Sequence, residues 1–183
     1  MKRLLVAFFG LMVALSFSSC GYNTMVSQDE NVKGKWAQVE NAYQRRADLV
    51  PQLVSTVKGA AEFEKSTFEA VTEARAQASS IKLDPSQMTE ADLQQFQQAQ
   101  DNLSKSLGRL MVTVEKYPDL KATANFKDLQ AQLEGTENRI AVERKKFNEA
   151  AQSYNTMIRR FPKNLLAKIY GFEKRPYFQA SPE

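Results

Sequence analysis

Residues 126–161 read FKDLQAQLEGTENRIAVERKKFNEAAQSYNTMIRRF, and this stretch decides the fold. Its apolar side chains recur at steps of three, four or seven residues, which is the spacing of one stripe along an α-helix. Such a helix would extend about 54 Å at about 1.5 Å per residue, so the rest of the chain must lie alongside it. The stripe consists of Phe126, Leu129, Leu133, Ile140, Phe147, Tyr154, Ile158 and Phe161.

Two further stretches carry similar stripes and predict helices beside the first. One covers about residues 29–80 and the other about residues 89–117, in which Gln100 is the one polar member of the stripe. The linker 79–87 between them is long enough for a hairpin. We therefore predict an all-α fold: an elongated antiparallel up-and-down helical bundle of three long helices, with a short C-terminal helix over residues 164–170.

Pro51 falls inside the first stripe without disturbing its register. A proline inside a helix removes a hydrogen bond and costs about 3 kcal/mol, so we predict that the first helix is kinked near Pro51. The segment 46–51 offers no turn residues, which favours one kinked arm over about 29–80. A separate helix that begins at Pro51 is the alternative.

Residues that typically begin or end helices mark most of the boundaries. Tyr117 and Phe161 each precede a proline, which pushes them out of the helical conformation, and Gly171 can close the C-terminal helix. Three pairs have the spacing of an N-terminal cap, namely Ser27 with Glu30, Thr89 with Asp92, and Asn125 with Asp128.

The N-terminal segment has the features of an export signal. Lys2 and Arg3 precede an uncharged apolar run over residues 4–17, which is shorter than the roughly 20 residues that span a bilayer. Small residues before Cys20 resemble the lipobox of bacterial lipoproteins, in which the cysteine thiol receives lipid. We predict cleavage before Cys20 and its lipidation. An incidental cysteine after an ordinary signal peptide and an uncut membrane anchor are the alternatives.

These features also predict the organisation and the location of the protein. We expect a signal peptide over residues 1–19, an anchor linker over 20–28, the helical bundle over 29–178 and a tail over 179–183. No acidic residue follows Cys20 to indicate retention in an inner membrane. We therefore expect a lipoprotein of the cell envelope at the periplasm-facing outer membrane, with an uncut single-pass anchor as the alternative.

The composition argues against most kinds of catalytic and metal centre. The chain has no histidine, which removes the usual general base and most zinc or copper sites. Ser55 and Lys58 match the Ser-x-x-Lys motif of penicillin-binding enzymes, but no Ser-Asp-Asn or Lys-Thr-Gly motif accompanies them. The net charge of +4 is too small to imply nucleic acid. We predict no enzyme activity, no cofactor and no nucleic-acid partner.

Several charged residues fall on the apolar stripes. Arg46, Glu64 and Arg75 lie on the first arm, and Glu143 lies on the helix over 126–161. A buried charge is costly unless it is paired. Either these side chains reach solvent at the edge of the stripe, or they form a polar layer that fixes the register of the helices or lines a site.

The C-terminal stretch is basic, with aromatic residues interleaved. Residues 159–175 hold six basic side chains against one acidic side chain, Glu173, and the aromatic residues are Phe172, Tyr177 and Phe178. Either this stretch packs across the bundle with its basic side chains outward, or it contacts anionic lipid or a partner.

A series of short sequence blocks points to a known protein family. The blocks are Tyr22-Asn23, Trp36, RRADLVPQLV at 45–54, VKG at 57–59, YPDLK at 117–121, ENRI at 137–140 with Arg144, Phe147-Asn148, Tyr154-Asn155, Phe161-Pro162 and Gly171-Phe172. In this order, over residues 22–178, they resemble the LemA family of bacterial envelope proteins. The chain departs from the family at Phe147, where tyrosine is common, and its lipobox replaces the longer N-terminal membrane helix that is often seen.

The resemblance implies an antiparallel helical bundle, held at a membrane by its N-terminus and facing the outside of the cytoplasm. It implies no accepted catalytic activity and no known ligand. Asp48, Glu137 and Arg144 lie in family blocks together with Arg46. We therefore expect them in the same charged, hydrogen-bonded layer inside the bundle.

Together these observations predict a non-catalytic scaffold or protein-interaction module. Its expected partners are the membrane, through the lipid anchor, and unidentified envelope proteins, and self-association through the apolar stripes is possible. The alternative is a carrier of a lipid or other apolar ligand between the helices. The aromatic residues Trp36, Tyr43, Phe68 and Phe96 motivate that alternative.

Overall fold

The computed structural model of the protein describes residues 2–58 and 65–179, with side chains from residue 21 onward. The helices are α1 (Lys2–Lys58), α2 (Lys65–Ser80), α3 (Glu90–Val114), α4 (Pro118–Ala122), α5 (Ala124–Arg159) and α6 (Lys163–Tyr170). No β-strand occurs in the two described ranges, and the predicted all-α class is confirmed. Within the same ranges, no helix combines the length and the hydrophobicity that a membrane span requires.

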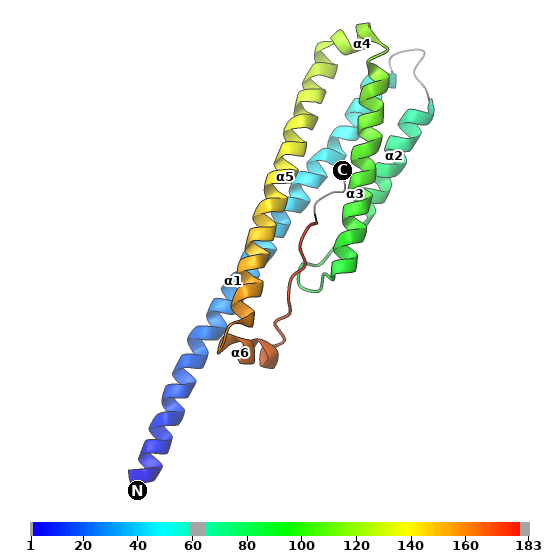
Figure 1. The fold of residues 1–183 in the computed structure, drawn as a ribbon. Coiled ribbons are helices and arrows are strands. Elements are labelled where there is room, and N and C mark those ends of the chain that lie inside the picture. Colours follow the sequence, from blue (N-terminus) through cyan, green and yellow to red (C-terminus); the bar gives the residue numbers. More distant parts are fainter. Residues whose placement is uncertain (1, 59–64, 180–183) are drawn as a thin grey trace.

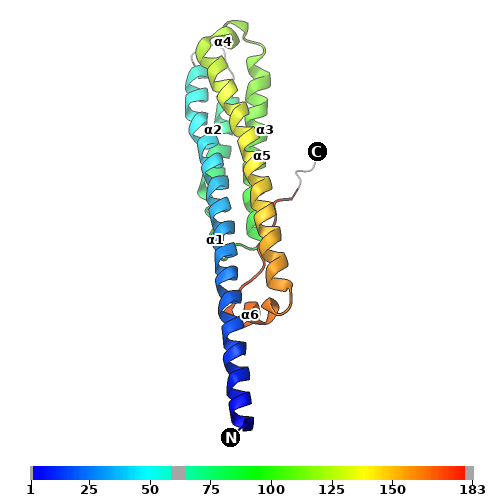
Figure 2. The ribbon, with the colours of Figure 1, turned by 90° about the vertical axis from the view of Figure 1, so that its left-hand side faces the viewer.

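The four longest helices form an elongated bundle (Figure 1 and Figure 2). α1 packs along α5, and α2 packs on α3. α1 and α3 run toward the end that α4 covers, whereas α2 and α5 run back from it (Figure 1). α6 lies at the opposite end, and the first turns of α1 project beyond it (Figure 2). The bundle is thus antiparallel and up-and-down.

The hydrophobic core is divided along the bundle into two clusters. The cluster near α6, here called the basal core, is built around Trp36 and Tyr154. The cluster near α4, here called the distal core, is built around Leu53 and Leu110. Along α1 the basal core ends at Tyr43 and the distal core begins at Leu49, so a short non-apolar level separates them.

The arm predicted over residues 29–80 is two antiparallel helices, α1 and α2, and not one kinked helix. α1 continues through Pro51 to Lys58, and Arg75 Nε on α2 donates to the Ala47 carbonyl oxygen at 2.7 Å. The chain reverses between Lys58 and Lys65, after the segment 46–51 that lacks turn residues. A stripe of apolar residues indicates which face is buried but not the direction of the chain, so one continuous pattern also fits a hairpin.

The predicted helix starts are correct in one case of three. Thr89 caps α3: its Oγ1 accepts from the Asp92 amide at 3.2 Å, and the Asp92 carboxylate accepts from the Thr89 amide at 3.0 Å. α5 begins at Ala124 and is capped by Thr123 rather than by Asn125. Ser27 begins no helix, because α1 runs through that position without interruption.

The predicted C-terminal ends of α6 and α5 agree with the structure to different degrees. α6 closes at Gly171 as predicted, with a left-handed φ of 73°, and the Phe172 amide donates to the Ala167 carbonyl oxygen at 2.9 Å. Phe161, the last member of the predicted central stripe, lies beyond the end of α5 at Arg159 and is 81% exposed. The helix thus ends just before Phe161-Pro162, as the proline predicts, whereas the apolar stripe extends it slightly too far.

Candidate functional site

Arg46 is buried at the level between the basal and distal cores, with 1% of its surface exposed. Its Nη1 donates to Glu137 Oε1 of α5 at 2.9 Å and to Ser104 Oγ of α3. Its Nη2 donates to Gln100 of α3, at 3.0 Å to the carbonyl oxygen and at 2.6 Å to Oε1. Gln100 Nε2 donates in turn to the Ala78 carbonyl oxygen of α2 at 3.1 Å. These contacts, here called the central polar layer, join all four long helices.

The central polar layer fixes the helices in one register. A guanidinium presents its donors in a rigid planar fork, so its partners must stand at set positions on the neighbouring helices. If one helix slipped by a turn, about 5.4 Å, Arg46 would be left as an unpaired buried charge. The side chains of the layer are already paired with one another, which suits the packing of helices better than the binding of a ligand.

Three other residues expected in this layer lie elsewhere or outside the described part of the chain. Asp48 is exposed on α1 and accepts from Gln44 Nε2 at 2.7 Å. Arg75 is half-buried and reaches the backbone of Ala47. Glu64 lies outside the described residues. The expectation placed Asp48 beside Arg46 because both lie in one family block, but residues two apart on a helix point to different faces.

Glu143 and Arg144 lie on α5, away from the central polar layer and toward the basal core. Glu143 is buried, and its Oε1 accepts from Arg139 Nε at 2.8 Å and Lys146 Nζ at 3.1 Å, both on the same helix. The Arg144 guanidinium lies 4.7 Å from the ring centroid of Phe178 in the C-terminal tail. Of the six described residues among the seven expected in one layer, the structure brings together only Arg46 and Glu137.

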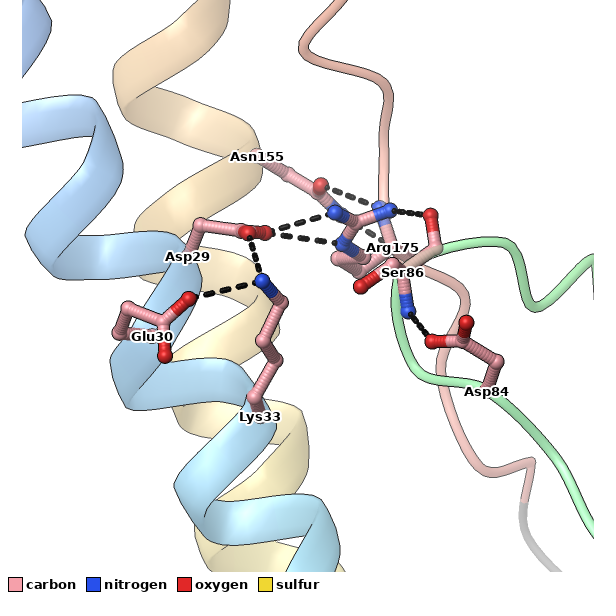
Figure 3. Close-up of polar contacts among 7 residues, drawn as sticks. All are labelled: Asp29, Glu30, Lys33, Asp84, Ser86, Asn155 and Arg175. Atoms are coloured by element: carbon pink, nitrogen blue, oxygen red, sulfur yellow. Dashed lines mark hydrogen bonds and ion pairs between the residues drawn. The ribbon is translucent and has the colours of Figure 1, made fainter.

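A second buried ion pair joins the C-terminal tail to α1. Arg175 is 8% exposed, and its Nη2 and Nε lie 2.6 Å and 3.2 Å from Asp29 Oδ1 (Figure 3). Its Nη1 donates to the Ser86 carbonyl oxygen at 2.6 Å, in the loop between α2 and α3. Asp29 also accepts from Lys33 Nζ at 3.0 Å, and Lys33 contacts Glu30 (Figure 3).

Two asparagines of α5 hold the backbone of the same tail. Asn155 Nδ2 donates to the Arg175 carbonyl oxygen and Asn155 Oδ1 accepts from the Arg175 amide, both at 2.8 Å. Asn148 makes the same pair of bonds with Phe178, at 3.0 Å and 2.9 Å. Seven helical residues advance about 10.5 Å and three extended residues about 10 Å, so the two spacings match.

The tail also completes the basal core. Phe178 is buried, and its ring is nearly parallel to that of Trp36 with 6.0 Å between centroids. It also meets Phe147 edge-on at 5.6 Å. The contacts of residues 172–179 with Asp29, Ser86, Asn148 and Asn155 are here called the C-terminal clasp. The expectation that all basic side chains of this stretch point outward is therefore wrong for Arg175.

An open groove runs along the outer side of α5. It consists of two adjoining hollows of about 690 Å³ and 650 Å³, which share Glu149 and Gln152 in their walls. The first is also lined by Arg144, Asn148 and the tail, and the second reaches Thr24 of α1. This surface is here called the outer groove, and most of its lining is polar or charged.

Ser55 and Lys58, the motif residues considered for catalysis, lie on a shallow hollow of about 350 Å³ together with Pro51 and Arg75. Lys58 Nζ lies 5.6 Å from the ring centroid of Phe68, a cation–π contact that gives its charge a partner. Among the side chains that the structure describes, no group of three or more Cys, Asp or Glu residues is placed to hold a metal ion.

Comparison with known proteins identifies the family. The family model described as the LemA family matches residues 35–183. The chain belongs to the LemA family. This LemA-family chain is 30% identical to the magnetosome protein MamQ 2 of Paramagnetospirillum magneticum (strain AMB-1), over 88% of the chain and 65% of that protein. It is 28% identical to MamQ of Magnetospirillum gryphiswaldense over the same shares.

A relative that carries the family's own name is more distant. The LemA protein of Metamycoplasma hominis is 25% identical to this chain, over 98% of the chain and 80% of that protein. Because the chain covers 65% of the length of the MamQ proteins, about a third of each of those proteins has no counterpart in the alignment. The LemA-family match contains the central polar layer and all members of the C-terminal clasp except Asp29.

The electrostatics of Asp29 follow from its place in the clasp of this LemA-family fold. Burial alone would raise the pKa of its carboxyl group. Hydrogen bonds from Arg175 and Lys33, together with their positive charges, outweigh burial and hold the pKa below its ordinary value of 3.8. The ionised form of Asp29 is therefore favoured by the folded state.

The free energy of unfolding should thus depend on the ionisation of Asp29. Because the folded-state pKa is the lower one, ionised Asp29 stabilises the fold above about pH 4, and this contribution is lost as the pH falls through the folded-state value. Urea unfolding followed by circular dichroism, from neutral pH to about pH 3, should show that wild type loses its advantage over Asp29→Asn. A constant difference between the two proteins across this range would contradict the assignment.

Proposed function

We propose that this LemA-family protein is a non-catalytic docking module of the bacterial cell envelope, held at a membrane by lipid on Cys20. The membrane in this proposal is the periplasm-facing outer membrane. α1 supports a close coupling of anchor and bundle, because its backbone runs as one helix from Lys2 through the position of Cys20 and on to Lys58. Its partners are other proteins of the envelope, which include further copies of the same chain.

The outer groove is the observation that carries the docking role. Its two hollows extend from the tail at Gln179 to Thr24 of α1, so it reaches the end of the bundle next to the predicted anchor. The groove is open, with exposed Tyr177 as an aromatic contact point, and most of its lining residues are polar or charged, although apolar atoms supply more of the lining surface. Such a surface suits a protein segment better than a small apolar ligand, which needs an enclosed apolar pocket.

The clasp supports the same proposal by its chemistry. α5 binds residues 172–179 through the backbone groups of Arg175 and Phe178. Recognition of main-chain groups does not depend on the side chains of the bound segment. α5 therefore carries a working arrangement for holding an extended polypeptide along its length, directly beside the outer groove.

No specific observation favours the alternative of a lipid carrier. The aromatic side chains that motivated it pack against one another or against the core. Trp36 and Tyr43 lie 5.5 Å and 5.1 Å from the ring of Phe96, measured between centroids. Phe68 is buried in the distal core. These rings fill the space between the helices that an apolar ligand would need.

Site-specific photo-crosslinking in intact cells tests the docking role. A photoreactive residue at Gln152, which lines both hollows, should form crosslinks to one or a few envelope proteins. The matched control is Asn138, which is also exposed on α5 but does not line the groove. A further Cys20→Ala substitution in the Gln152 variant should abolish the crosslinks if anchoring brings the partners within reach.

The outcomes separate the parts of the proposal. Crosslinks at Gln152 that are absent at Asn138 would support docking in the outer groove. Identical products at both positions, or none at either, would argue against it. Crosslinks that persist unchanged with Cys20→Ala would leave docking in place but would contradict the need for a lipid anchor.

A further inference from the structure

The end of the bundle next to α1 residue 21 exposes an unusual number of apolar side chains. Leu165 and Ile169 of α6 are 55% and 73% exposed, and Phe161, just before α6, is 81% exposed. Leu165 and Ile169 are four residues apart and so share one face of the helix. Tyr170 and Tyr22 are also exposed, at 56% and 39%.

The other face of α6 is fixed to the bundle. Ala167 is buried in the basal core, and Leu166 and Phe172 pack against it. Tyr22 of α1 lies 4.9 Å from the ring of Tyr170, measured between centroids. α6 is therefore packed against the bundle on one side, while Leu165 and Ile169 remain exposed on the other. These two residues and Phe161 are here called the apolar ridge.

The apolar ridge lies close to the predicted lipid anchor at Cys20. The Leu166 side chain approaches Gly21 so closely that a Cβ at Gly21 would lie 3.0 Å from Leu166 Cδ1. Cys20, the predicted lipidation site, is the residue before Gly21. Figure 1 shows α6 lying across the end of the bundle from which the N-terminal turns of α1 project.

Basic residues surround the apolar ridge. Residues 159–174 contain five basic side chains and one acidic side chain, Glu173. Arg159, Arg160, Lys168 and Lys174 are exposed, and Lys163 is half-buried. A helix that combines an exposed apolar edge with flanking basic and aromatic residues is typical of a segment that lies in the interface of an anionic bilayer.

We propose that α6 is a membrane-surface foot, in which Phe161, Leu165 and Ile169 enter the headgroup region of an anionic bilayer. The neighbouring lysine and arginine side chains contact the lipid phosphates. The occupant is a membrane rather than a second copy of the chain, because face-to-face pairing of two such ends would bring their positive charges together. Phe161 and Lys163 also line the end of the outer groove next to α6, so the foot and the groove adjoin each other. The inference rests on the membrane anchoring in the proposed function, but not on docking in the outer groove.

A second contact of this kind adds to a lipid anchor in two ways. Binding by one acyl signal is strengthened by an independent polar or apolar signal nearby. In addition, contact at α6 prevents the bundle from pivoting freely about residue 20, so that the outer groove keeps a fixed height above the membrane.

Bromolipid quenching of tryptophan fluorescence tests the foot in the full chain. Phe161→Trp places a fluorophore on the ridge, and the native Trp36, which is 1% exposed, provides the constant background. Val112→Trp is the matched control, because Val112 is 69% exposed at the α4 end of the bundle. The full-length proteins are reconstituted into brominated phosphatidylcholine vesicles, with or without an equal part of phosphatidylglycerol, and membrane attachment is checked by flotation.

In the anionic vesicles, the emission added by Trp at position 161 should be lost, whereas that added at position 112 should remain. Combined Lys163→Gln, Lys168→Gln and Lys174→Gln substitutions should restore the position-161 emission. Flotation without quenching at position 161 would overturn the foot and leave anchoring intact. Quenching that is equal with and without phosphatidylglycerol would overturn the role of charge. A blue shift without quenching would show that protein covers the ridge, and failure to float would overturn the anchoring itself.

Discussion

Replacing Arg46 with alanine should lower the free energy of unfolding by about 3 to 5 kcal/mol, because it deletes a large buried side chain together with the hydrogen bonds of its two Nη atoms. The substitution leaves the side chains of Gln100 and Ser104 without their donor and creates a cavity at the level between the two cores. Since small domains are stable by only about 5 to 15 kcal/mol, a shift of this size should be evident in urea unfolding followed by circular dichroism.

The matched control is Glu137→Ala, which breaks the ion pair from its exposed side. The Glu137 side chain is 40% exposed, whereas that of Arg46 is 2% exposed. Arg46 keeps its bonds to Gln100 and Ser104 in this variant, so Glu137→Ala should cost less than Arg46→Ala. The cost should still exceed the roughly 1 kcal/mol of a surface ion pair, because the buried guanidinium loses its carboxylate. Equal losses for the two variants would contradict the view that the bonds from Arg46 to Gln100 and Ser104 carry the layer.

Replacing Arg46 with methionine separates the role of charge from that of volume. Methionine fills much of the same space without a charge to pair, and such replacements of buried ion pairs are often neutral for stability. We therefore expect Arg46→Met to unfold at a higher urea concentration than Arg46→Ala. If the polar layer fixes the register of the helices, Arg46→Met should also show hydrogen exchange at more amides of α2 and α3 than wild type does, even where the free energies of unfolding of the two proteins are similar.

Replacing Asp29 with alanine should release the C-terminal tail from the bundle, because the buried Arg175 guanidinium would lose its carboxylate and keep only uncharged neighbours, the Ser86 carbonyl oxygen and the Tyr154 ring. The loss should be about 3 kcal/mol, or roughly a hundredfold in the opening equilibrium of the tail. Hydrogen exchange should show it directly. The Arg175 and Phe178 amides, which donate to Asn155 and Asn148, should lose protection, and trypsin should cleave after Lys174.

Lys33→Ala is the matched control for the clasp. Lys33 contacts the same carboxylate as Arg175, but its side chain is 32% exposed, compared with 8% for Arg175. We therefore expect an effect below about 1 kcal/mol and continued protection of the tail amides. If the Asp29→Ala protein also kept that protection, the ion pair would not be what holds the tail.

The parts of the fold that depend on local pattern were predictable from the sequence. The helix over α5 follows from the spacing of its apolar residues, the cap at Thr89 from a side chain three residues ahead of its partner, and the end of α6 from Gly171. The reversal between α1 and α2 was not predictable in the same way. Both helices bury the same kind of stripe, so the apolar period passes through the reversal unchanged.

In the candidate site, too, residues that interrupt a local pattern could be predicted, and residues whose partners are distant in sequence could not. Arg46 and Gln100 stood out because each interrupts an apolar stripe. Asp29, Asn148 and Asn155 gave no such signal, because their partners lie in an extended tail that has no period. The contact between Asp29 and Arg175 joins residues 146 positions apart. Two hints were available: both asparagines lie in family blocks, and their seven-residue spacing places both side chains on one face of α5.

The C-terminal clasp has a consequence for the order in which the parts of the protein can fold. A chain that appears N-terminal end first, at the ribosome or at the far side of a membrane, presents residues 175 and 178 after the six helices. Until they emerge, Trp36 lacks the ring that stacks on it and Asp29 lacks its buried partner. The distal core draws on residues 49–133 alone, so that half of the bundle has all its components earlier. The half that contains the clasp should therefore be the last to mature, and a chain whose C-terminal residues have not yet emerged should stay open at that end while the opposite end is already folded.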